Sequence, residues 1–384
     1  HSPPSIKSCY ATYTHVLTQM MAHKAIKDEN IGADAAAAML AEYVQLRDKR
    51  VYSDDVDQDA ITDEDDRMAL NPIDLVKLKR DGRVKGRSCV DGRPQREHIP
   101  KEQCASPTIA NNSLMLIMSV AAKERRKVAT ADVAGAYLHA DMDDFVLVKF
   151  TGTALDLMCK VNPEYKKLIR IRNGKRVTYL RLAKALYGCL KSALLWYKLF
   201  KGTLEDMGFK LNKYDPCVAN KKIKGKQFTI GWWVDDNAMT HDSDSVIDDV
   251  INEIEAKFGK MTVTRGDRHT FLGMNFHFPG DGKVSINMKE YIEEAAEVFG
   301  EDLTRKVSTP ANKDLFEEDE KTVPLDKDHA VRFRSVVMKL QWVAERGRPD
   351  VRLPIKYLTT RMAKLTHTGL AKIATSSIVP VADY

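Results

Sequence analysis

An apolar stretch of this chain runs directly into two adjacent carboxylates. Trp232 and Trp233 are followed, after one valine, by Asp235 and Asp236. Aspartates are common in tight turns, so an Asp-Asp pair alone is ordinary turn chemistry. A buried strand that ends in two like charges is costly, however, unless a cation balances them. The pair therefore indicates a strand end that is built around a cation.

The pattern on either side of this pair predicts an α+β fold. The expected helices cover residues 10–50, with Asp34 as an N-cap, then 111–125, 192–207 with a stop at Gly208, and 245–258. The expected strands cover short segments of 71–90 around the turn Asp81-Gly82, then 127–133, 228–234 and 238–240 joined by a tip at 235–237, and 270–278. Strand, helix, two strands, helix and strand in this order are typical of a split βαβ sheet.

A third carboxylate, Asp132, stands at the end of the predicted strand 127–133. Phosphoryl transfer to a nucleotide uses two magnesium ions about 3.5–4 Å apart, one at the attacking oxygen and one at the leaving group. Magnesium prefers carboxylate oxygens, so two or three carboxylates on rigid neighbouring elements make a minimal site. Asp132, Asp235 and Asp236 are therefore the candidate ligands of two Mg²⁺ ions, with Mn²⁺ as a substitute.

Positive charge is concentrated in two segments of a chain whose net charge is only +6. Residues 77–96 hold eight basic and two acidic side chains, and residues 160–184 hold nine basic and one acidic side chain. Such clusters favour a polyanionic partner such as nucleic acid. The alternative is two solvated basic faces.

Residues 53–66 carry eight carboxylates and few apolar side chains, which predicts an exposed linker. Asp55, Asp57 and Asp59 have the alternate spacing of a calcium loop, with Asp66 at the twelfth position. Ala60 stands where that loop needs glycine, and Asp66 is shorter than the expected glutamate, so the calcium pattern is incomplete.

Other classes of function lack their signatures. No apolar run is long enough to span a bilayer, and no signal peptide opens the chain, so no membrane partner is expected. The six cysteines never form a CxxC pair, which disfavours zinc and favours reduced thiols inside the cell. No Ser-His-Asp, Cys-His or glycine-rich phosphate loop competes with the carboxylates. The first residue is His1, so we expect the chain to be cut from a longer protein such as a polyprotein.

Seven segments, in order, resemble reverse transcriptases of copia-type retrotransposons. They are Ala131–Ala140, Leu182–Ser192 with Trp196-Tyr197, Trp233–Asp236, Phe271–Met274, Tyr291 with Ser308–Pro310, Phe333–Ser335 and Arg348–Asp350. One such motif is weak, but seven in the family's order over roughly residues 14–365 are strong. The chain departs from the family pattern at Trp233, where tyrosine is usual, and at Lys191, Ala193 and Leu194, where Gln, Pro and Arg are common.

The resemblance implies a right-hand polymerase with fingers, a palm whose antiparallel sheet packs on helices, and a partial thumb. The implied division is an N-terminal helical segment and acidic linker at 1–66, fingers and palm with the start of the thumb at 67–312, and a partial thumb or connection with an unassigned tail at 313–384. The implied partners are dNTPs and an RNA or DNA template with its primer, together with ribonuclease H and integrase regions of the same polyprotein. The implied location is cytoplasmic, in a virus-like particle if the element is active, or nuclear.

The resemblance also implies roles for single residues. Tyr137 would lie under the sugar of the incoming nucleotide and exclude a 2′-hydroxyl; packing in the palm core is the alternative. Lys85 and Arg87 would meet the triphosphate, where a guanidinium can bind two oxygens at once; a solvated face is the alternative. The primer grip would be Phe271, Leu272 and Gly273, which could equally form an ordinary strand.

Two rival functions stay open on the sequence. A catalytically inactive retroelement remnant would bind nucleic acid without extending a primer, although the three aspartates are intact. A metal-dependent nuclease could use the same acidic triad, although Tyr137 and the basic residues of the predicted fingers argue against it. Primer extension on an RNA template separates the polymerase from both.

Overall fold

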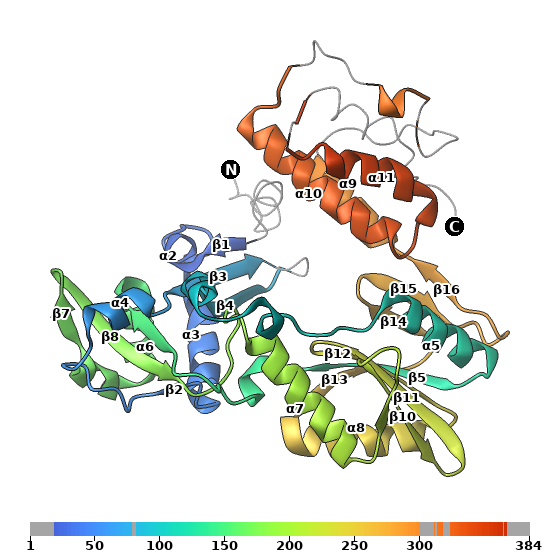
Figure 1. Ribbon diagram of the computed structural model, residues 1–384, viewed down its shortest axis with the longest axis horizontal. Helices are drawn as coiled ribbons and strands as arrows, with labels where there is room; N and C mark the ends of the chain where they lie inside the picture. The colour runs from blue at the N-terminus through green and yellow to red at the C-terminus, as the bar shows by residue number, and fades with distance from the viewer. Residues whose placement is uncertain are drawn as a thin grey trace, which may run out of the picture.

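The computed structural model describes residues 19–78, 82–299, 311, 313–317, 323–363 and 365–366. Its elements form three units (Figure 1). The N-terminal unit comprises residues 19–104 and 138–190, the central unit comprises 109–137 and 191–288, and the C-terminal helical unit comprises the described residues from 289 onward. The chain passes three times between the first two units.

The N-terminal unit contains two antiparallel sheets and four helices. The strands are β1 (Gln19–Met21), β2 (Tyr52–Ser53), β3 (Pro72–Leu78), β4 (Val84–Val90), β6 (Leu147–Phe150), β7 (Arg170–Arg172) and β8 (Lys175–Leu182), and the helices are α2 (Ala22–Ala25), α3 (Gly32–Asp48), α4 (Asp63–Met68) and α6 (Gly152–Val161). Short 3-10 helices lie at Arg93–Glu97, Lys101–Gln103 and Pro163–Leu168. One sheet has the order β1-β3-β4, and the other has β2-β8-β6 with β7 beside β8.

The sheet that bears the basic strand β4 packs closely on α3. A side chain at Gly86 would place its Cβ only 2.6 Å from the carbonyl oxygen of Ala38, so β4 needs glycine to approach the helix. Where one helix was predicted over residues 10–50, the structure has β1 and then two helices, α2 and α3, and the part before residue 19 lies outside the described residues. We had expected Asp34 to be the N-cap of the helix, but the N-cap is Ile31. Asp34 lies in the first turn of α3, where the helix dipole favours an acid.

The central unit is a six-stranded antiparallel sheet covered by helices on both faces. Its elements are α5 (Asn111–Lys123), β5 (Lys127–Val133), a 3-10 helix η3 (Ala136–His139) that crosses into the N-terminal unit, α7 (Ser192–Asp206), β9 (Lys210–Leu211), β10 (Val218–Ile223), β11 (Lys226–Trp233), β12 (Asp236–His241), α8 (Asp244–Phe258), β13 (Met261–Thr264), β14 (Arg268–Phe271), β15 (Met274–His277) and β16 (Ser285–Asn287). The sheet has the order β13-β5-β12-β11-β10-β9, and β14-β15-β16 form a separate small sheet.

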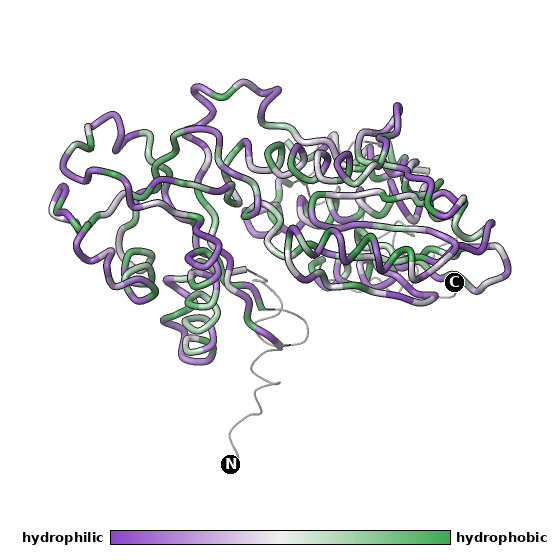
Figure 2. The backbone as a smooth tube through the Cα atoms, turned by 90° about the horizontal axis from the view of Figure 1, so that it is seen from below, coloured by the Kyte–Doolittle hydropathy of each residue, from purple (hydrophilic) through white to green (hydrophobic). Residues whose placement is uncertain are grey.

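Two adjacent residues of β11 contact helices on opposite faces of the sheet. The ring of Trp232 lies 5.6 Å from that of Phe200 on α7, whereas Gly231 faces Ile117 on α5. Figure 1 shows α5 and the α7-α8 pair on opposite sides of the sheet, and in Figure 2 green segments run through both units while purple follows the outer loops. The predicted α+β fold with an antiparallel sheet packed on helices is confirmed.

The C-terminal helical unit consists of α9 (Lys289–Phe299), α10 (Lys327–Ala344) and α11 (Arg352–Thr360), with 3-10 turns at Lys313–Phe316 and Pro349–Val351. Its three helices share a small core of their own. The motif at 308–310 and the tail at 376–384 lie outside the described residues. The predicted divisions after residues 66 and 312 stay predictions. Among the described residues no helix is both long and apolar enough to cross a membrane.

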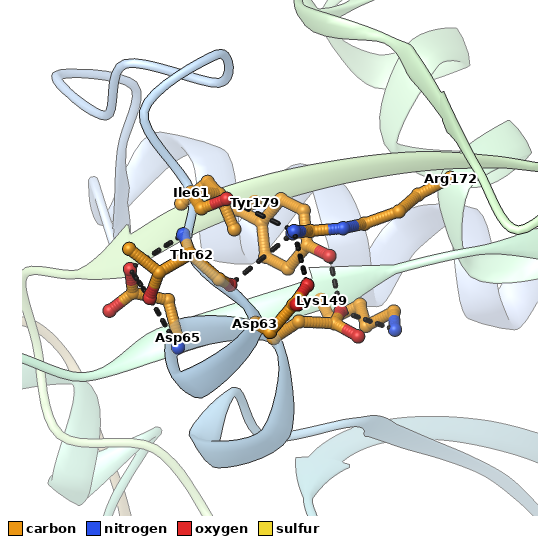
Figure 3. Close-up of polar contacts among 8 residues, drawn as sticks. Ile61, Thr62, Asp63, Asp65, Lys149, Arg172 and Tyr179 are labelled. Atoms are coloured by element: carbon orange, nitrogen blue, oxygen red, sulfur yellow. Dashed lines mark hydrogen bonds and ion pairs between the residues drawn. The ribbon is translucent and has the colours of Figure 1, made fainter.

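Residues 53–66, which we expected to form an exposed linker, are bound to the β2-β8-β6 sheet (Figure 3). The side chain of Gln58 is only 8% exposed; its Nε2 donates to the Tyr179 carbonyl (2.7 Å), and its Oε1 accepts from the Tyr179 amide (2.9 Å). Thr62 caps α4 in a reciprocal bond with Asp65. The Gln58 side chain therefore holds the segment against the sheet, and the composition alone could not show this.

Candidate active site

The three predicted carboxylates meet at one end of the central sheet. Asp132 on β5 is paired directly opposite Asp236 on β12, and Asp235 stands in the turn that precedes β12. Side chains that are paired in this way lie on the same face, with Cβ atoms about 5 Å apart. The amide of Val133 donates to the Asp235 carbonyl over 3.1 Å, which fixes the turn to the end of β5.

The turn between β11 and β12 differs from the predicted one. Trp233 pairs with Asp236, so the tip is Val234-Asp235, and Asp236 and Asn237 already belong to β12. Val234 has a φ of 56°, a left-handed conformation that is strained for a β-branched residue. Surrounding bonds must therefore hold this tip.

Two side chains hold the strained tip. The indole Nε1 of Trp196 on α7 donates to the Val234 carbonyl over 2.7 Å. The side-chain amide of Asn237, which is fully buried, donates to the Asp235 carbonyl over 2.9 Å. Sequence reasoning did not give either residue this role, although the Trp196-Tyr197 pair was a signal because it resembles a family motif.

The three carboxylates repel one another. Burial, together with the charges of Asp235 and Asp132, raises the pKa of Asp236 to about 6. Burial also raises the pKa of Asp132, with Asp235 adding to the rise and Lys85 opposing it. Within the described ranges no three His, Cys, Asp or Glu side chains converge as a ready-made metal site. The oxygen donors and their mutual repulsion nevertheless fit hard divalent cations.

This repulsion predicts a measurable instability of the metal-free protein. With EDTA at pH 8, Asp236→Asn should be more stable than the wild type by about 1–2 kcal/mol, allowing for solvent screening of a half-buried carboxyl. The folded pKa of about 6 lies above the ordinary value of about 3.9. Wild-type stability should therefore fall as the pH rises from about 4 through 6, and the variant should lack this fall.

Thermal unfolding with and without Mg²⁺ checks the expectation. Mg²⁺ should raise the melting temperature of the wild type more than that of Asp236→Asn. Asp242→Asn is the matched control, because Asp242 is paired with Lys226 (3.2 Å) at the other end of the same hairpin. An Asp236→Asn protein that is less stable than the wild type in EDTA would contradict the repulsion argument.

Tyr137 lies beside the carboxylates on η3, directly after β5. Gly135, with a φ of 63°, turns the chain into this short helix. The Tyr137 ring is half-buried, and its centroid lies 4.6 Å from that of Tyr187. Burial raises the pKa of Tyr137, and the charge of Asp235 adds to the rise. Tyr187 was missed as a neighbour, although it stands in the Leu-Tyr-Gly stretch that resembles the family.

Arg87 and Lys85 reach the same place from β4. The Arg87 guanidinium lies 4.7 Å from the centre of the Tyr187 ring, and Arg87 opposes the rise in the pKa of Tyr137. Both basic side chains are exposed on the face of β4 that points away from α3, and Lys85 is paired in register with Lys77. In the part of the chain that the structure describes, neither Lys85 nor Arg87 has an ion-pair partner. The structure therefore brings these two residues, Tyr137 and the carboxylates together.

The second basic segment, 160–184, is largely neutralised within the protein. The pairs are Arg170–Asp59 (2.7 Å), Arg172–Asp63 (3.0 Å), Arg176–Asp156 (3.2 Å), Arg181–Asp55 (2.6 Å) and Lys184–Asp141 (2.5 Å). Three of the acids come from the acidic segment at 53–66, and Figure 3 shows Arg172 reaching this segment. The paired carboxylates of the acidic segment are thus directed at basic side chains rather than toward a common calcium ion. The first segment, around β4, remains the better candidate for binding phosphates.

The predicted primer grip is the turn of the β14-β15 hairpin. Leu272 and Gly273 both have positive φ values, 53° and 76°, as in a two-residue type I′ turn. Phe271 is only 3% exposed and packs in the core of the central unit. The Leu272 carbonyl accepts a bond from the Trp342 indole over 3.0 Å. Phe271 is therefore a buried residue of an ordinary strand, as the alternative interpretation had it. A contact of the Leu272-Gly273 turn with a primer stays a prediction.

Lys191, one of the departures from the family pattern, is a buried structural residue. Its ammonium group lies 2.7 Å from Asp143 and 3.0 Å from Asp144. These pairs tie the start of α7 to the loop before β6, so Lys191 is not displayed toward a template.

Comparison with known proteins relates this chain to reverse transcriptases. A family model described as reverse transcriptase (RNA-dependent DNA polymerase) matches residues 73–313. The retrovirus-related Pol polyprotein from transposon TNT 1-94 of Nicotiana tabacum is 26% identical over 243 residues, which cover 62% of this chain and 17% of the polyprotein. A putative transposon Ty5-1 protein of Saccharomyces cerevisiae is 26% identical over 230 residues, which cover 59% of this chain and 68% of that protein.

Two further similarities are weaker. The Ty1-GR1 Gag-Pol polyprotein of Saccharomyces cerevisiae is 22% identical over 273 residues, which cover 69% of this chain and 14% of the polyprotein. Among solved structures, a foamy viral protease-reverse transcriptase in complex with double-stranded DNA has a TM-score of 0.40 and 14% identity, covering 78% of this chain and 42% of that one. The matched family model spans more than half of the chain, and the similar polyproteins come from Ty1/copia-type elements. The chain belongs to the reverse transcriptase (RNA-dependent DNA polymerase) family and is of the Ty1/copia retrotransposon type.

Proposed function

We propose that this chain performs RNA-directed DNA synthesis, adding dNTPs to the 3′ end of a primer on an RNA or DNA template. The observation that carries the proposal is the placement of Asp132 opposite Asp236, with Asp235 in the adjoining turn. These three residues would hold two Mg²⁺ ions, for which Mn²⁺ could substitute. Two ions held there would lower the barrier by stabilising the attacking and leaving oxygens of the displacement.

The residues around the carboxylates would do the positioning. Arg87 and Lys85 are exposed and form no ion pair among the described residues, so they can bind the triphosphate of the incoming nucleotide. Tyr137 offers a rigid aromatic wall against the sugar, because its ring is packed on Tyr187. Trp196 and Asn237 hold the Val234-Asp235 tip, so that Asp235 stays at the end of β5.

The three units correspond to the parts of a right-hand polymerase. The N-terminal unit would be the fingers, the central unit the palm, and the C-terminal helical unit the thumb. As a retroelement protein it would work beside ribonuclease H and integrase regions of one polyprotein, in the cytoplasm within a virus-like particle or in the nucleus.

Extension of a labelled DNA primer on an RNA template with Mg²⁺ and dNTPs tests the proposal. We expect full-length product that depends on all four dNTPs. Binding without extension would favour an inactive remnant, and shortening of the labelled strand would favour a nuclease; either result would overturn the proposal.

A further inference from the structure

The end of α10 is fixed beside the candidate active site. The ring of Trp342 lies 5.9 Å from that of Trp233 in an edge-to-face contact at 87°, and its indole donates to the Leu272 carbonyl. The side-chain amide of Asn111, at the start of α5, donates to the Glu345 carbonyl over 2.9 Å. The C-terminal helical unit is thus joined to β11, to the β14-β15 turn and to α5 at one place.

Arg346 places at this junction a guanidinium that forms no ion pair among the described residues, although the charge of Glu345 acts on it. Its guanidinium lies 3.2 Å from the centre of the Trp342 ring and 6.0 Å from that of Trp233. Its Nε is buried without a hydrogen-bond partner among the described residues, and its Nη1 reaches only the Trp342 carbonyl at 3.5 Å. The neighbouring Glu345 is paired with Arg352 at 3.2 Å instead.

A half-buried guanidinium with unused donors calls for an anion. Arginine remains charged in proteins, and its planar group binds two oxygens of a phosphate at once. Contact with the Trp342 ring, whose centre lies 3.2 Å from the guanidinium carbon, holds this group in place. Such an anion would complete a site that the protein leaves unsatisfied.

The position of the site indicates which phosphate it takes. Trp233 is paired with Asp236 across the hairpin, so their side chains share one face of the sheet. The candidate triphosphate residue Arg87 approaches this face from the N-terminal unit, whereas Arg346 approaches from the C-terminal helical unit. A phosphate bound by Arg346 would therefore be a different one from the triphosphate that Arg87 is a candidate to bind.

We propose that Arg346 binds a backbone phosphate of the primer strand close to its 3′ end and so positions the primer terminus; this inference rests on the proposed function. The nearby β14-β15 turn, held by Trp342, would be set against the same strand. Arg346 is thus a positioning residue, since it touches none of the reacting atoms.

The test compares Arg346→Met with the wild type on a fluorescent DNA primer annealed to RNA, without dNTPs. Affinity should fall about 3–10-fold, and the slope of log Kd against log salt should decrease by about one, because one phosphate contact is lost. Arg265→Met is the matched control, because Arg265 is a partly buried arginine of the central unit that is already paired with Asp248. Its salt slope should not change.

Primers with one neutral methylphosphonate linkage locate the contact. The wild type should lose affinity when the neutral linkage stands at one of the last few positions of the primer. The affinity of Arg346→Met should not change when that same linkage is neutral. Arg346→Lys should lose part of the affinity that the wild type loses there. A lower melting temperature with an unchanged slope and an unchanged linkage profile would show a purely structural role and overturn the inference. Wild-type extension is measured separately, so a protein that binds with the predicted slope but extends nothing would contradict the proposed function alone.

Discussion

The Asp235→Asn protein should bind a primer–template duplex as tightly as the wild type but extend the primer at least about 1,000-fold more slowly, a loss of about 4 kcal/mol in stabilisation of the transition state. The substitution removes one negative charge from the set that would hold the two metal ions. Asparagine has the same shape as aspartate, and the tip is held through backbone carbonyls by Trp196 and Asn237, so the turn should keep its conformation.

Single-turnover extension and equilibrium binding together measure this effect. Asp242→Asn is the control, because it makes the same chemical change in the same hairpin at an acid that is paired with Lys226. This variant should extend the primer at the wild-type rate. An Asp235→Asn protein that retains more than a few per cent of the wild-type rate would show that Asp235 is not a metal ligand. Loss of binding in parallel with extension would indicate a damaged fold instead.

The carboxylate end of the sheet was largely predictable, because the local signals were strong. The strand that ends near Asp132 and the apolar strand before Asp235 were both expected from their own residues, and the structure has β5 and β11 there. That Asp132 and Asp236 are direct neighbours depends on the pairing of β5 with β12, which no local pattern fixes. The chemistry of a two-metal site and the resemblance to a family, rather than a local pattern, put the three carboxylates in one site.

The misplaced hairpin tip shows how long-range contacts override local preference. Turn propensity favours Asp and Asn over valine at a left-handed position. The structure places Val234 there because bonds from α7 and β12 hold its neighbourhood. The acidic segment was misjudged for the same reason, since its basic partners lie more than 100 residues further along the chain. Charge counts gave the composition of both segments but could not show that they neutralise each other.

The second large effect concerns the sugar of the incoming nucleotide. Tyr137→Val should reduce the preference for a dNTP over its matching rNTP by at least about 100-fold, while dNTP incorporation falls only modestly. Rejecting one added hydroxyl needs a rigid wall at that point. The Tyr137 ring is such a wall, because it is wedged between Tyr187 and the turn after β5.

Tyr137 has two possible roles, as a sugar gate or as a packing residue. In the first its ring excludes the 2′-hydroxyl, and in the second the ring only fills space. If the ring is the wall, Tyr137→Phe keeps the wall and should keep the selectivity, since only the hydroxyl is lost. Tyr214→Val makes the same change at a side chain that is 98% exposed and should alter neither rate. If Tyr137 only packs, Tyr137→Val should lower dNTP and rNTP incorporation together, because the lost ring contact with Tyr187 is worth about 0.5–1.5 kcal/mol to either reaction. The ratio of the two incorporation efficiencies therefore decides between the two roles, and a ratio that does not move would remove Tyr137 from the nucleotide site.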